Sequence, residues 1–234
     1  TLNGKGYVDT HPEAWAVNEK GERVEAATWF MGACPTEPGF RKYRFDQLRD
    51  LLLEYDLDGV WMDYVHWHAQ FEDPEPILRC AVIFDWTSNI KSIMTEIKPD
   101  ALLGLYHCPW TDEEYNGARE RILGLDYNLL KKTIDVFSPM VYHQRMGRAP
   151  SWVEENIEWF SNKIGAEDGA YPKIWPIVQA YNEPGIVTNE AFETVLRGGL
   201  AGKSSGVMMF TTHAIAEDEG KTEVMKKVYQ NPMK

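Results

Sequence analysis

The sequence has few cysteines and no surplus of basic residues. Its three cysteines, Cys34, Cys80 and Cys108, lack CxxC spacing. The sequence therefore predicts neither a disulfide framework nor a structural zinc site. There are 24 basic and 36 acidic residues among the 234, which gives a formal net charge of −12. Because nucleic-acid phosphates require a basic surface, this charge argues against a nucleic-acid partner and favours a neutral or cationic ligand.

Long apolar runs are absent as well. No run approaches the roughly 20 residues of a membrane-spanning helix, so we expect no membrane partner. The start, TLNGKGYVDTHPEAW, has neither the basic nor the apolar region of a secretion signal. Since Thr1 is not an initiator methionine, we expect a processed chain or part of a longer one. The compartment stays open, and secretion or a periplasmic location would require a signal peptide that has been removed.

Aromatic residues, in contrast, are abundant, with 9 Trp, 11 Tyr and 9 Phe. Such rings fill cores, and their flat faces also form stacking platforms for sugars or bases. Short apolar runs alternate with longer amphipathic stretches, which predicts an α/β protein of repeated βα units. The nearly continuous apolar runs fit parallel strands covered on both faces, and they occupy residues 57–65, 101–108, 135–143, 173–181 and 205–213. The stretches that predict helices cover residues 40–56, 76–98, 126–134, 150–164, 189–200 and 217–230.

Five βα units fall short of the eight that close a (β/α)8 or TIM barrel, which takes about 250 residues. The alternative is an open doubly wound sheet. Nucleotide-binding sheets of that kind often carry a glycine-rich phosphate loop, and no GxGxxG or GxxxxGK motif is present. We therefore predict one TIM-barrel domain over residues 1–234 that covers strands four to eight and lacks the first strands.

In a TIM barrel the active site forms at the C-terminal ends of the strands. All five predicted strands end in hydrogen-bonding side chains accompanied by rings, which suits a polyhydroxylated ligand. The candidate ligand-binding residues are His66, Trp67, His68, Tyr106, His107, Trp110, Tyr142, His143, Arg145, Gln179, Tyr181 and His213.

Asp63 is the principal catalytic candidate. It follows the apolar run GVWM, so we expect its carboxylate to emerge at the mouth of the sheet, where burial and neighbours tune its pKa. A structural role, in capping a loop or pairing with Arg145, is the alternative. Asp58 lies at the start of the same run and is predicted to be a turn or helix-end residue.

Cleavage of a glycoside needs two carboxyl groups, roughly 5 Å apart when the anomeric configuration is retained and roughly 6.5–9.5 Å apart when it is inverted. Glu183, after the fourth run, is the candidate partner of Asp63, and an exposed loop position before Pro184 is the alternative interpretation. The weaker rivals are Asp9, Glu13, Asp112, Glu113, Glu114 and Asp126.

The six histidines raise the possibility of a metal centre. His66 and His68 form an HWH motif, but barrel hydrolases usually carry HxH on a strand, and here the motif follows the strand's aspartate. We therefore predict hydrogen-bonding or packing roles for the histidines and no metal ligand. Cys34 could be a reactive thiol, but it lies close to prolines and the sequence shows no base that would activate it. We therefore predict that it packs in the interior or forms part of a pocket wall.

Four segments resemble the hypothetical glycoside hydrolase-like families of the (β/α)8 glycosidase superfamily. These are HPEAWAVNEKGE, CPTEPGFRKY, YDLDGVWMDYVHWH and GLDYNLLKKTIDVFSPMVYH. In these families Y-D-x-D-G-V/I-x-x-D forms the fourth barrel strand and D-x-x-x-P-M-x-Y the sixth. The resemblance spans about His11 to His213 and implies that strands four to eight lie in this chain.

A weaker similarity is to family 18 chitinase-like enzymes, whose fourth strand reads D-G-x-D-x-D-x-E and whose sixth carries M-x-Y-D. Val65 stands where that motif has its acid, and His143 replaces the aspartate, so the family's substrate-assisted mechanism is not implied. Only the strand-end position of Asp63 and the pocket position of Tyr142 carry over. The α-galactosidase-like barrels, which have a strand-four Asp nucleophile, resemble this chain only at Asp63 and Tyr64.

These observations lead to the hypothesis of a glycoside hydrolase that acts on an oligo- or polysaccharide. Asp63 would be the nucleophile or general acid and Glu183 its partner, with a carbohydrate ligand and no cofactor. Linkage, anomer and oligomeric state stay open. The alternatives are a non-catalytic sugar-binding barrel and a metal-dependent barrel hydrolase.

Overall fold

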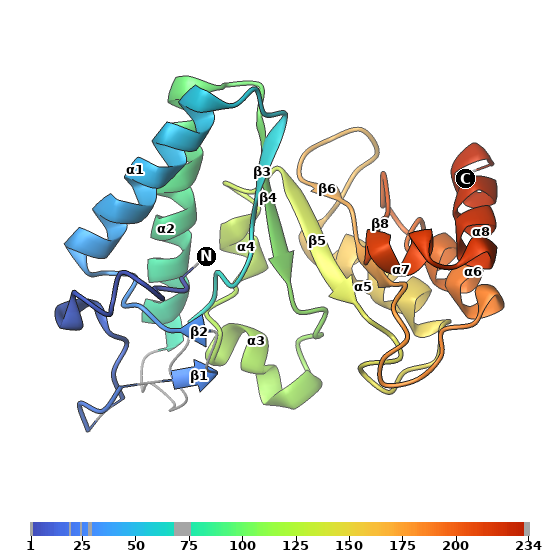
Figure 1. The fold of residues 1–234 in the computed structure, drawn as a ribbon, viewed down its shortest axis with the longest axis horizontal. Helices are drawn as coiled ribbons and strands as arrows, with labels where there is room; N and C mark the ends of the chain where they lie inside the picture. The colour runs from blue at the N-terminus through green and yellow to red at the C-terminus, as the bar shows by residue number, and fades with distance from the viewer. Residues whose placement is uncertain (1, 19, 24, 28–29, 68–75, 232–234) are drawn as a thin grey trace. The chain divides into compact units, whose positions relative to one another are not determined.

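The computed structural model describes residues 2–18, 20–23, 25–27, 30–67 and 76–231 (Figure 1). The chain divides into two compact units, which we describe separately. The first comprises Thr1–Tyr106 and Asp112–Asp135, and the second comprises His107–Thr111 and Val136–Lys234. Over the described ranges, no helix combines the length and the apolar character needed to cross a membrane.

The first unit contains a parallel strand pair flanked by helices. Gly59 of β3 lies opposite Leu102 of β4, and Met62 lies opposite Leu105. Strands β1 and β2 form a separate antiparallel pair. The elements in chain order are η1 (Pro12–Ala14), β1 (Glu25–Ala27), β2 (Phe30–Met31), α1 (Pro38–Glu54), β3 (Gly59–Met62), α2 (Pro76–Ile97), β4 (Leu102–His107), η2 (Glu114–Gly117), α3 (Ala118–Arg121) and α4 (Tyr127–Leu130).

Local chemistry explains where these helices begin and end. Glu37 caps α1 because its carboxylate accepts hydrogen bonds from the N–H groups of Gly39 and Phe40, and Pro38 occupies the first helical position. Helix α2 ends at Ile97, two residues before Pro99. These signals place both helices within two residues of the predicted ranges.

Gly104 allows a close approach between β3 and β4. A Cβ atom at this position would lie 2.3 Å from Nε1 of Trp61. We therefore expect Gly104→Ala to lower the free energy of unfolding by about 1–3 kcal/mol, measured by urea denaturation, because the indole must move. In a Trp61→Val background the same substitution should cost less. An equal cost in both backgrounds would contradict the steric explanation.

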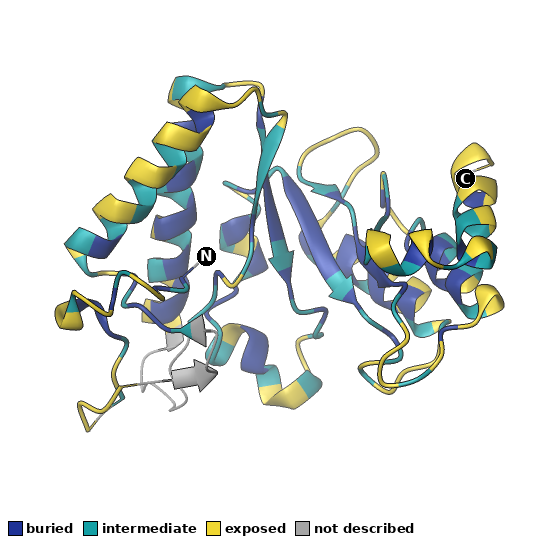
Figure 2. Ribbon diagram, viewed as in Figure 1, coloured by how far each residue is buried: buried dark blue, intermediate teal, exposed yellow. Residues whose placement is uncertain are grey.

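The second unit repeats the pattern of parallel strand and helix. Strand β5 pairs in parallel with β6 and β7, and β7 pairs in parallel with β8. Strands β5 and β7 and the inner faces of the helices are buried (Figure 2), whereas β8 is half-buried and ends in the exposed Phe210. The elements in chain order are β5 (Val136–Val141), α5 (Trp152–Ile164), β6 (Lys173–Ile174), β7 (Ile177–Gln179), α6 (Asn189–Gly198), β8 (Met208–Phe210), α7 (Thr212–Ala216) and α8 (Glu219–Gln230).

All five predicted strands are present, and the fold is that of a partial TIM barrel. The run 173–181 is split into β6 and β7 because Pro176, between them, has no N–H to continue the ladder. Helix α4 is shorter than the predicted 126–134, and α7 is an additional helix ahead of α8. In the described residues, strands β3, β4, β5, β7 and β8 are each followed by helical structure. The C-terminal ends of such strands are where a TIM barrel has its active site.

Candidate functional site

Asp63 lies directly after β3, at the C-terminal end of the strand. The residue is half-buried, and its carboxylate Oδ1 accepts a hydrogen bond from the backbone N–H of Tyr64 at 2.8 Å. Tyr64 has a φ of 52°, a left-handed conformation that is costly for a residue with a side chain. The backbone is thus sharply turned immediately after the candidate catalytic carboxylate.

Tyr106, near the end of the neighbouring strand β4, lies in the electrostatic field of Asp63. Burial, and secondarily the negative charge of Asp63, raise the pKa of the Tyr106 phenol. The phenol therefore stays protonated at neutral pH and is available as a hydrogen-bond donor. The first unit accordingly brings a carboxylate and a phenol to the same edge of its strand pair.

His66 and Trp67 follow on the loop after β3. His66 Nδ1 lies 3.1 Å from the carbonyl oxygen of Trp67, and burial lowers the pKa of His66 despite the nearby charge of Asp63. The Trp67 N–H donates to the carbonyl of Leu123, which fixes the loop at this point. His68, the remaining ligand-binding candidate on this loop, lies outside the described residues.

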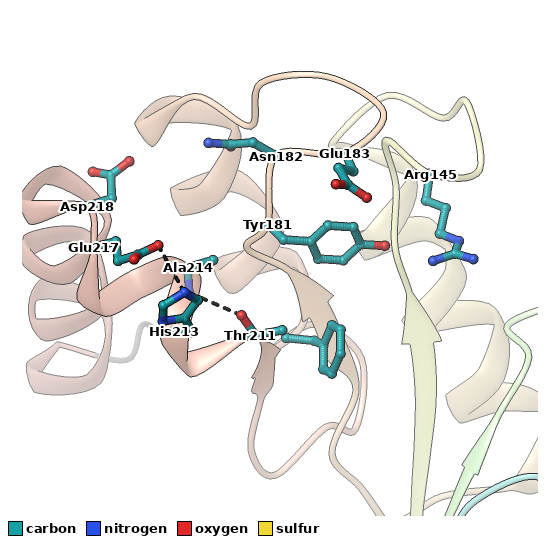
Figure 3. Close-up of a pocket in the computed structure, with 10 residues that line it drawn as sticks. Arg145, Tyr181, Asn182, Glu183, Thr211, His213, Ala214, Glu217 and Asp218 are labelled. Atoms are coloured by element: carbon teal, nitrogen blue, oxygen red, sulfur yellow. Dashed lines mark hydrogen bonds and ion pairs between the residues drawn. The ribbon is translucent and has the colours of Figure 1, made fainter. Parts of the chain in front are cut away.

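A pocket of about 650 Å³ opens at the C-terminal ends of the strands in the second unit (Figure 3). Three loops form it, after β5, after β7 and after β8, and they bring together Arg145, Tyr181, Glu183 and His213 from the predicted set. Figure 3 shows the Tyr181 hydroxyl pointing toward the side that carries Arg145. The lining residues are Arg145, Tyr181, Asn182, Glu183, Phe210, Thr211, His213, Ala214, Glu217 and Asp218.

The charged side chains Arg145, Glu183 and His213 of this pocket are exposed. Glu183 is exposed, as the alternative interpretation of the sequence expected, and its side chain nevertheless lines the pocket. His213 is largely exposed, and its Nε2 lies 3.2 Å from a Glu217 carboxylate oxygen, an ion pair when the histidine is protonated. The Tyr181 hydroxyl is buried and has no hydrogen-bond partner in the described part of the chain. The pocket therefore offers a ligand carboxylates and a guanidinium group.

Three aromatic rings stand together at this pocket. The ring centroid of Tyr142 lies 5.9 Å from that of Tyr181 and 5.8 Å from that of Phe210, and Tyr181 meets Phe210 edge to face at 5.8 Å. Each ring comes from the end of a different strand. Tyr181 and Phe210 line the pocket, and Tyr142 packs against both of these rings.

Two buried polar side chains hold the loop that carries Glu183. The Gln179 amide accepts from the N–H of Arg145 at 3.0 Å and donates to the carbonyls of Tyr181 and Glu183 at 3.1 and 2.6 Å. Lys221 donates to the Ala180 carbonyl and to Asn182 Oδ1, each at 2.8 Å. Both side chains are almost fully buried. The observed role of Gln179 is therefore to position the backbone of the loop.

The remaining candidates lie in the second unit, outside the pocket lining. His107 is buried and packs against Phe137 and Phe160, with ring centroids 5.6 and 5.0 Å away. His143 is 4% exposed, and its Nδ1 has no hydrogen-bond partner among the residues described here. Trp110 is half-buried on the loop after β4. These three residues are thus not among the residues that line the pocket.

Burial lowers the pKa of His143, which makes stability sensitive to acid. In the unfolded chain the imidazole of His143 becomes protonated near pH 6.5, whereas in the folded chain it becomes protonated only at lower pH. Protonation therefore favours the unfolded chain, and stability is lost as the pH falls below about 6.5. We expect the free energy of unfolding to fall between pH 7 and 5, with a contribution from His143 of at most about 1.4 kcal/mol per pH unit. In urea titrations His143→Gln should flatten this dependence, and the exposed control His213→Gln should not.

Two of the rival carboxylates, Asp112 and Asp126, have structural partners. Asp112 forms a 2.5 Å ion pair with the buried Arg119, and Asp126 caps α4 by accepting from the N–H of Asn128. Among the residues that the structure describes, no three His, Cys, Asp or Glu side chains converge as a metal site would require.

Glu217 and Asp218 are pocket residues that the sequence did not reveal. They lie after β8, at the end of α7 and the start of α8, and not at a strand end. Asp218 also caps α8 by accepting from the Lys221 N–H. Their only sequence signal is their place four and five residues after His213, close to the last predicted strand.

Comparison with known proteins yields matches at the level of structure alone. No family model and no curated protein matches the sequence. The PgaB (BpsB) glycoside hydrolase domain from Bordetella bronchiseptica is similar with a TM-score of 0.65 and 12% identity, over 90% of this chain and 67% of that chain.

Two further solved structures show the same likeness. The beta-galactosidase from the psychrophilic Marinomonas ef1 matches with a TM-score of 0.63 and 9% identity over 88% of this chain. The maltogenic alpha-amylase AmyB from Thermotoga neapolitana matches with a TM-score of 0.52 and 13% identity over 92% of this chain. The chain spans 42% and 45% of the length of these two proteins. The chain therefore has a glycoside hydrolase-like barrel fold.

Proposed function

We propose that the protein is a glycoside hydrolase acting on an oligo- or polysaccharide. The observation that carries this proposal is the pocket of about 650 Å³ at the strand ends of the second unit. Its volume lies within the roughly 300–1,000 Å³ of small-molecule sites. Carboxylates, a guanidinium group and hydroxyl donors stand beside aromatic rings, which is the combination that binds sugar hydroxyls and sugar faces.

In this proposal Asp63 is the catalytic carboxylate and Glu183 its partner. In a retaining reaction Asp63 attacks the anomeric carbon while its partner protonates the departing oxygen, and water then releases the glycosyl group. In an inverting reaction one carboxylic acid protonates the leaving oxygen while the other carboxylate deprotonates the attacking water. The half-buried strand-end position of Asp63 and the placement of Glu183 on a pocket wall support these roles.

The binding residues follow from the same arrangement. Tyr142, Tyr181 and Phe210 would stack against sugar rings, while Arg145 and His213 would donate to hydroxyl groups. His66, Trp67 and Tyr106 would bind the sugar at the end of the first unit, next to Asp63. The solved structures with the same fold are named as glycosidases, which supports the reaction class.

A panel of reducing-end-labelled oligosaccharides tests the proposal. Incubation with the protein should shorten at least one of them, and mass spectrometry of the products would report the cleavage. Binding without cleavage would favour the non-catalytic sugar-binding barrel. Cleavage that a chelator abolishes and a divalent metal restores would favour the metal-dependent hydrolase.

A further inference from the structure

Asp63 and Tyr106 are neighbours at the ends of two adjacent strands of the first unit. Strands β3 and β4 run in parallel, and their last paired residues are Met62 and Leu105. Asp63 and Tyr106 are each the next residue after this pair. Because adjacent parallel strands are about 4.8 Å apart, the side chains of two such neighbours leave the sheet close together. A carboxylate and a phenol therefore lie within reach of a single sugar residue.

Both side chains also belong to the same face of the strand pair. A Cβ atom on Gly104 would clash with the indole of Trp61, so the Trp61 side chain covers the face of β4 to which a side chain at position 104 would point. Asp63 comes two residues after Trp61, and Tyr106 comes two residues after Gly104. The left-handed turn of the backbone comes only at Tyr64. Since side chains alternate along a strand with a period of two, Asp63 and Tyr106 share the face that Trp61 covers.

The phenol of Tyr106 is a hydrogen-bond donor without a partner in the protein. Tyr106 is half-buried, and burial together with the negative charge of Asp63 raises the pKa of its phenol, so the hydroxyl keeps its proton at neutral pH. Among the residues that the structure describes, this hydroxyl forms no hydrogen bond and Asp63 forms no ion pair. The hydroxyl can therefore donate to a molecule bound at Asp63.

The chemistry at Asp63 indicates which atom of a sugar this donor can help. In the proposed reaction Asp63 acts at the anomeric carbon, whose two neighbours in the ring are the ring oxygen and carbon 2. The transition state resembles an oxocarbenium ion, so positive charge develops on the ring oxygen. A hydrogen-bond donor at the ring oxygen would oppose this charge, whereas a hydrogen bond to the 2-hydroxyl group strengthens as the transition state forms. The 2-hydroxyl group is therefore the acceptor that fits the phenol.

We infer that Tyr106 is a further catalytic residue, which donates a hydrogen bond to the 2-hydroxyl group of the sugar residue at which Asp63 acts. The inference rests on the proposed function and narrows its substrate class to saccharides with an unsubstituted 2-hydroxyl group at the cleaved residue. Because the hydrogen bond is strongest in the transition state, Tyr106 raises kcat more than it lowers KM. A sugar that lacks the 2-hydroxyl group gains nothing from Tyr106.

The 4-nitrophenyl glycosides of glucose and galactose, in both anomeric configurations, test this inference together with their 2-deoxy and 6-deoxy forms. Tyr106→Phe should lower kcat/KM about tenfold for the parent glycoside and for its 6-deoxy form, the effect of one hydrogen bond. For the 2-deoxy form the loss should be less than about twofold, because the hydrogen bond is already absent. Comparing the variant with the unmodified protein on the same probe cancels the different intrinsic reactivities of the probes.

Tyr115→Phe is the control for the loss of a phenol hydroxyl. Tyr115 is an exposed tyrosine of the same unit, so its replacement should change kcat/KM less than about twofold on every probe. Equal losses of Tyr106→Phe on the parent and 2-deoxy probes would overturn the inference, since a merely structural role of Tyr106 would affect both probes alike.

Carbon-13 spectra of labelled tyrosine rings report the contact without any reaction. The Tyr106→Phe variant assigns the Tyr106 signals, which should shift more with the methyl glycosides of glucose or galactose than with their 2-deoxy forms. Shifts that do not depend on the 2-hydroxyl group, or unchanged signals, would overturn the inference while leaving sugar cleavage intact. Shifts that require the 2-hydroxyl group, without cleavage of any glycoside, would retain the contact and refute the hydrolase.

Discussion

Asp63→Asn is expected to lower kcat/KM for glycoside cleavage by at least about 10³-fold, with little change in saccharide affinity. Asparagine has nearly the same shape, and its side-chain oxygen can still accept the hydrogen bond that Asp63 receives from the N–H of Tyr64. It can neither attack the anomeric carbon nor exchange a proton with the leaving group. Initial rates of reducing-end release, together with calorimetric affinities, would measure both effects.

Asp58→Asn is the matched control for this substitution. Asp58 precedes β3, at the opposite end of the same strand, and it is exposed. The same loss of one charge there should change kcat/KM less than about twofold, since the active site of a barrel forms at the C-terminal strand ends. Full activity of Asp63→Asn would refute the catalytic role of Asp63. Equal losses of activity in both variants would mean that the loss of a negative charge or of stability, and not the loss of a catalytic group, lowers the rate.

Lys221→Met is expected to lower the stability of the fold and to weaken saccharide binding as well. Lys221 is 1% exposed and donates to the carbonyl of Ala180 and to Asn182. Methionine fills similar space but leaves the carbonyl oxygen of Ala180 without this donor, at a cost of about 2 kcal/mol. The loop between β7 and α6 carries Tyr181 and Glu183, so its loosening should reduce the affinity for saccharide about tenfold.

Urea denaturation and calorimetry would measure these two effects, and Lys227→Met supplies the control. Lys227 lies on the same helix, but it is exposed and pairs with Glu193 near the surface. Its replacement should change the free energy of unfolding by less than about 1 kcal/mol. A Lys221 variant as stable as the Lys227 variant would contradict the structural role of the buried ammonium group.

The strands and most helices could be predicted from the sequence because their signals are local. Continuous apolar runs mark strands that are covered on both faces, and proline marked the end of α2. The position of Asp63 after a strand followed from the same pattern. The split of one predicted strand at Pro176 shows how a missing N–H overrides an otherwise continuous run.

The parts of the site that escaped prediction depend on the path of the chain. Gln179 was a candidate for ligand binding, but its amide bonds to the loop backbone, which only the folded loop reveals. Lys221 belongs to an amphipathic helix, where a lysine is normally a surface residue.

The most direct test of the proposed catalytic pair is a crystal structure of Asp63→Asn with an oligosaccharide that the unmodified protein cleaves. We predict that the glycosidic oxygen lies within hydrogen-bonding distance of residue 63 or residue 183, and that the other residue lies on the opposite side of the bond. Carboxyl groups roughly 5 Å apart would indicate retention, and roughly 6.5–9.5 Å would indicate inversion. A saccharide bound with its scissile bond away from both residues would contradict it.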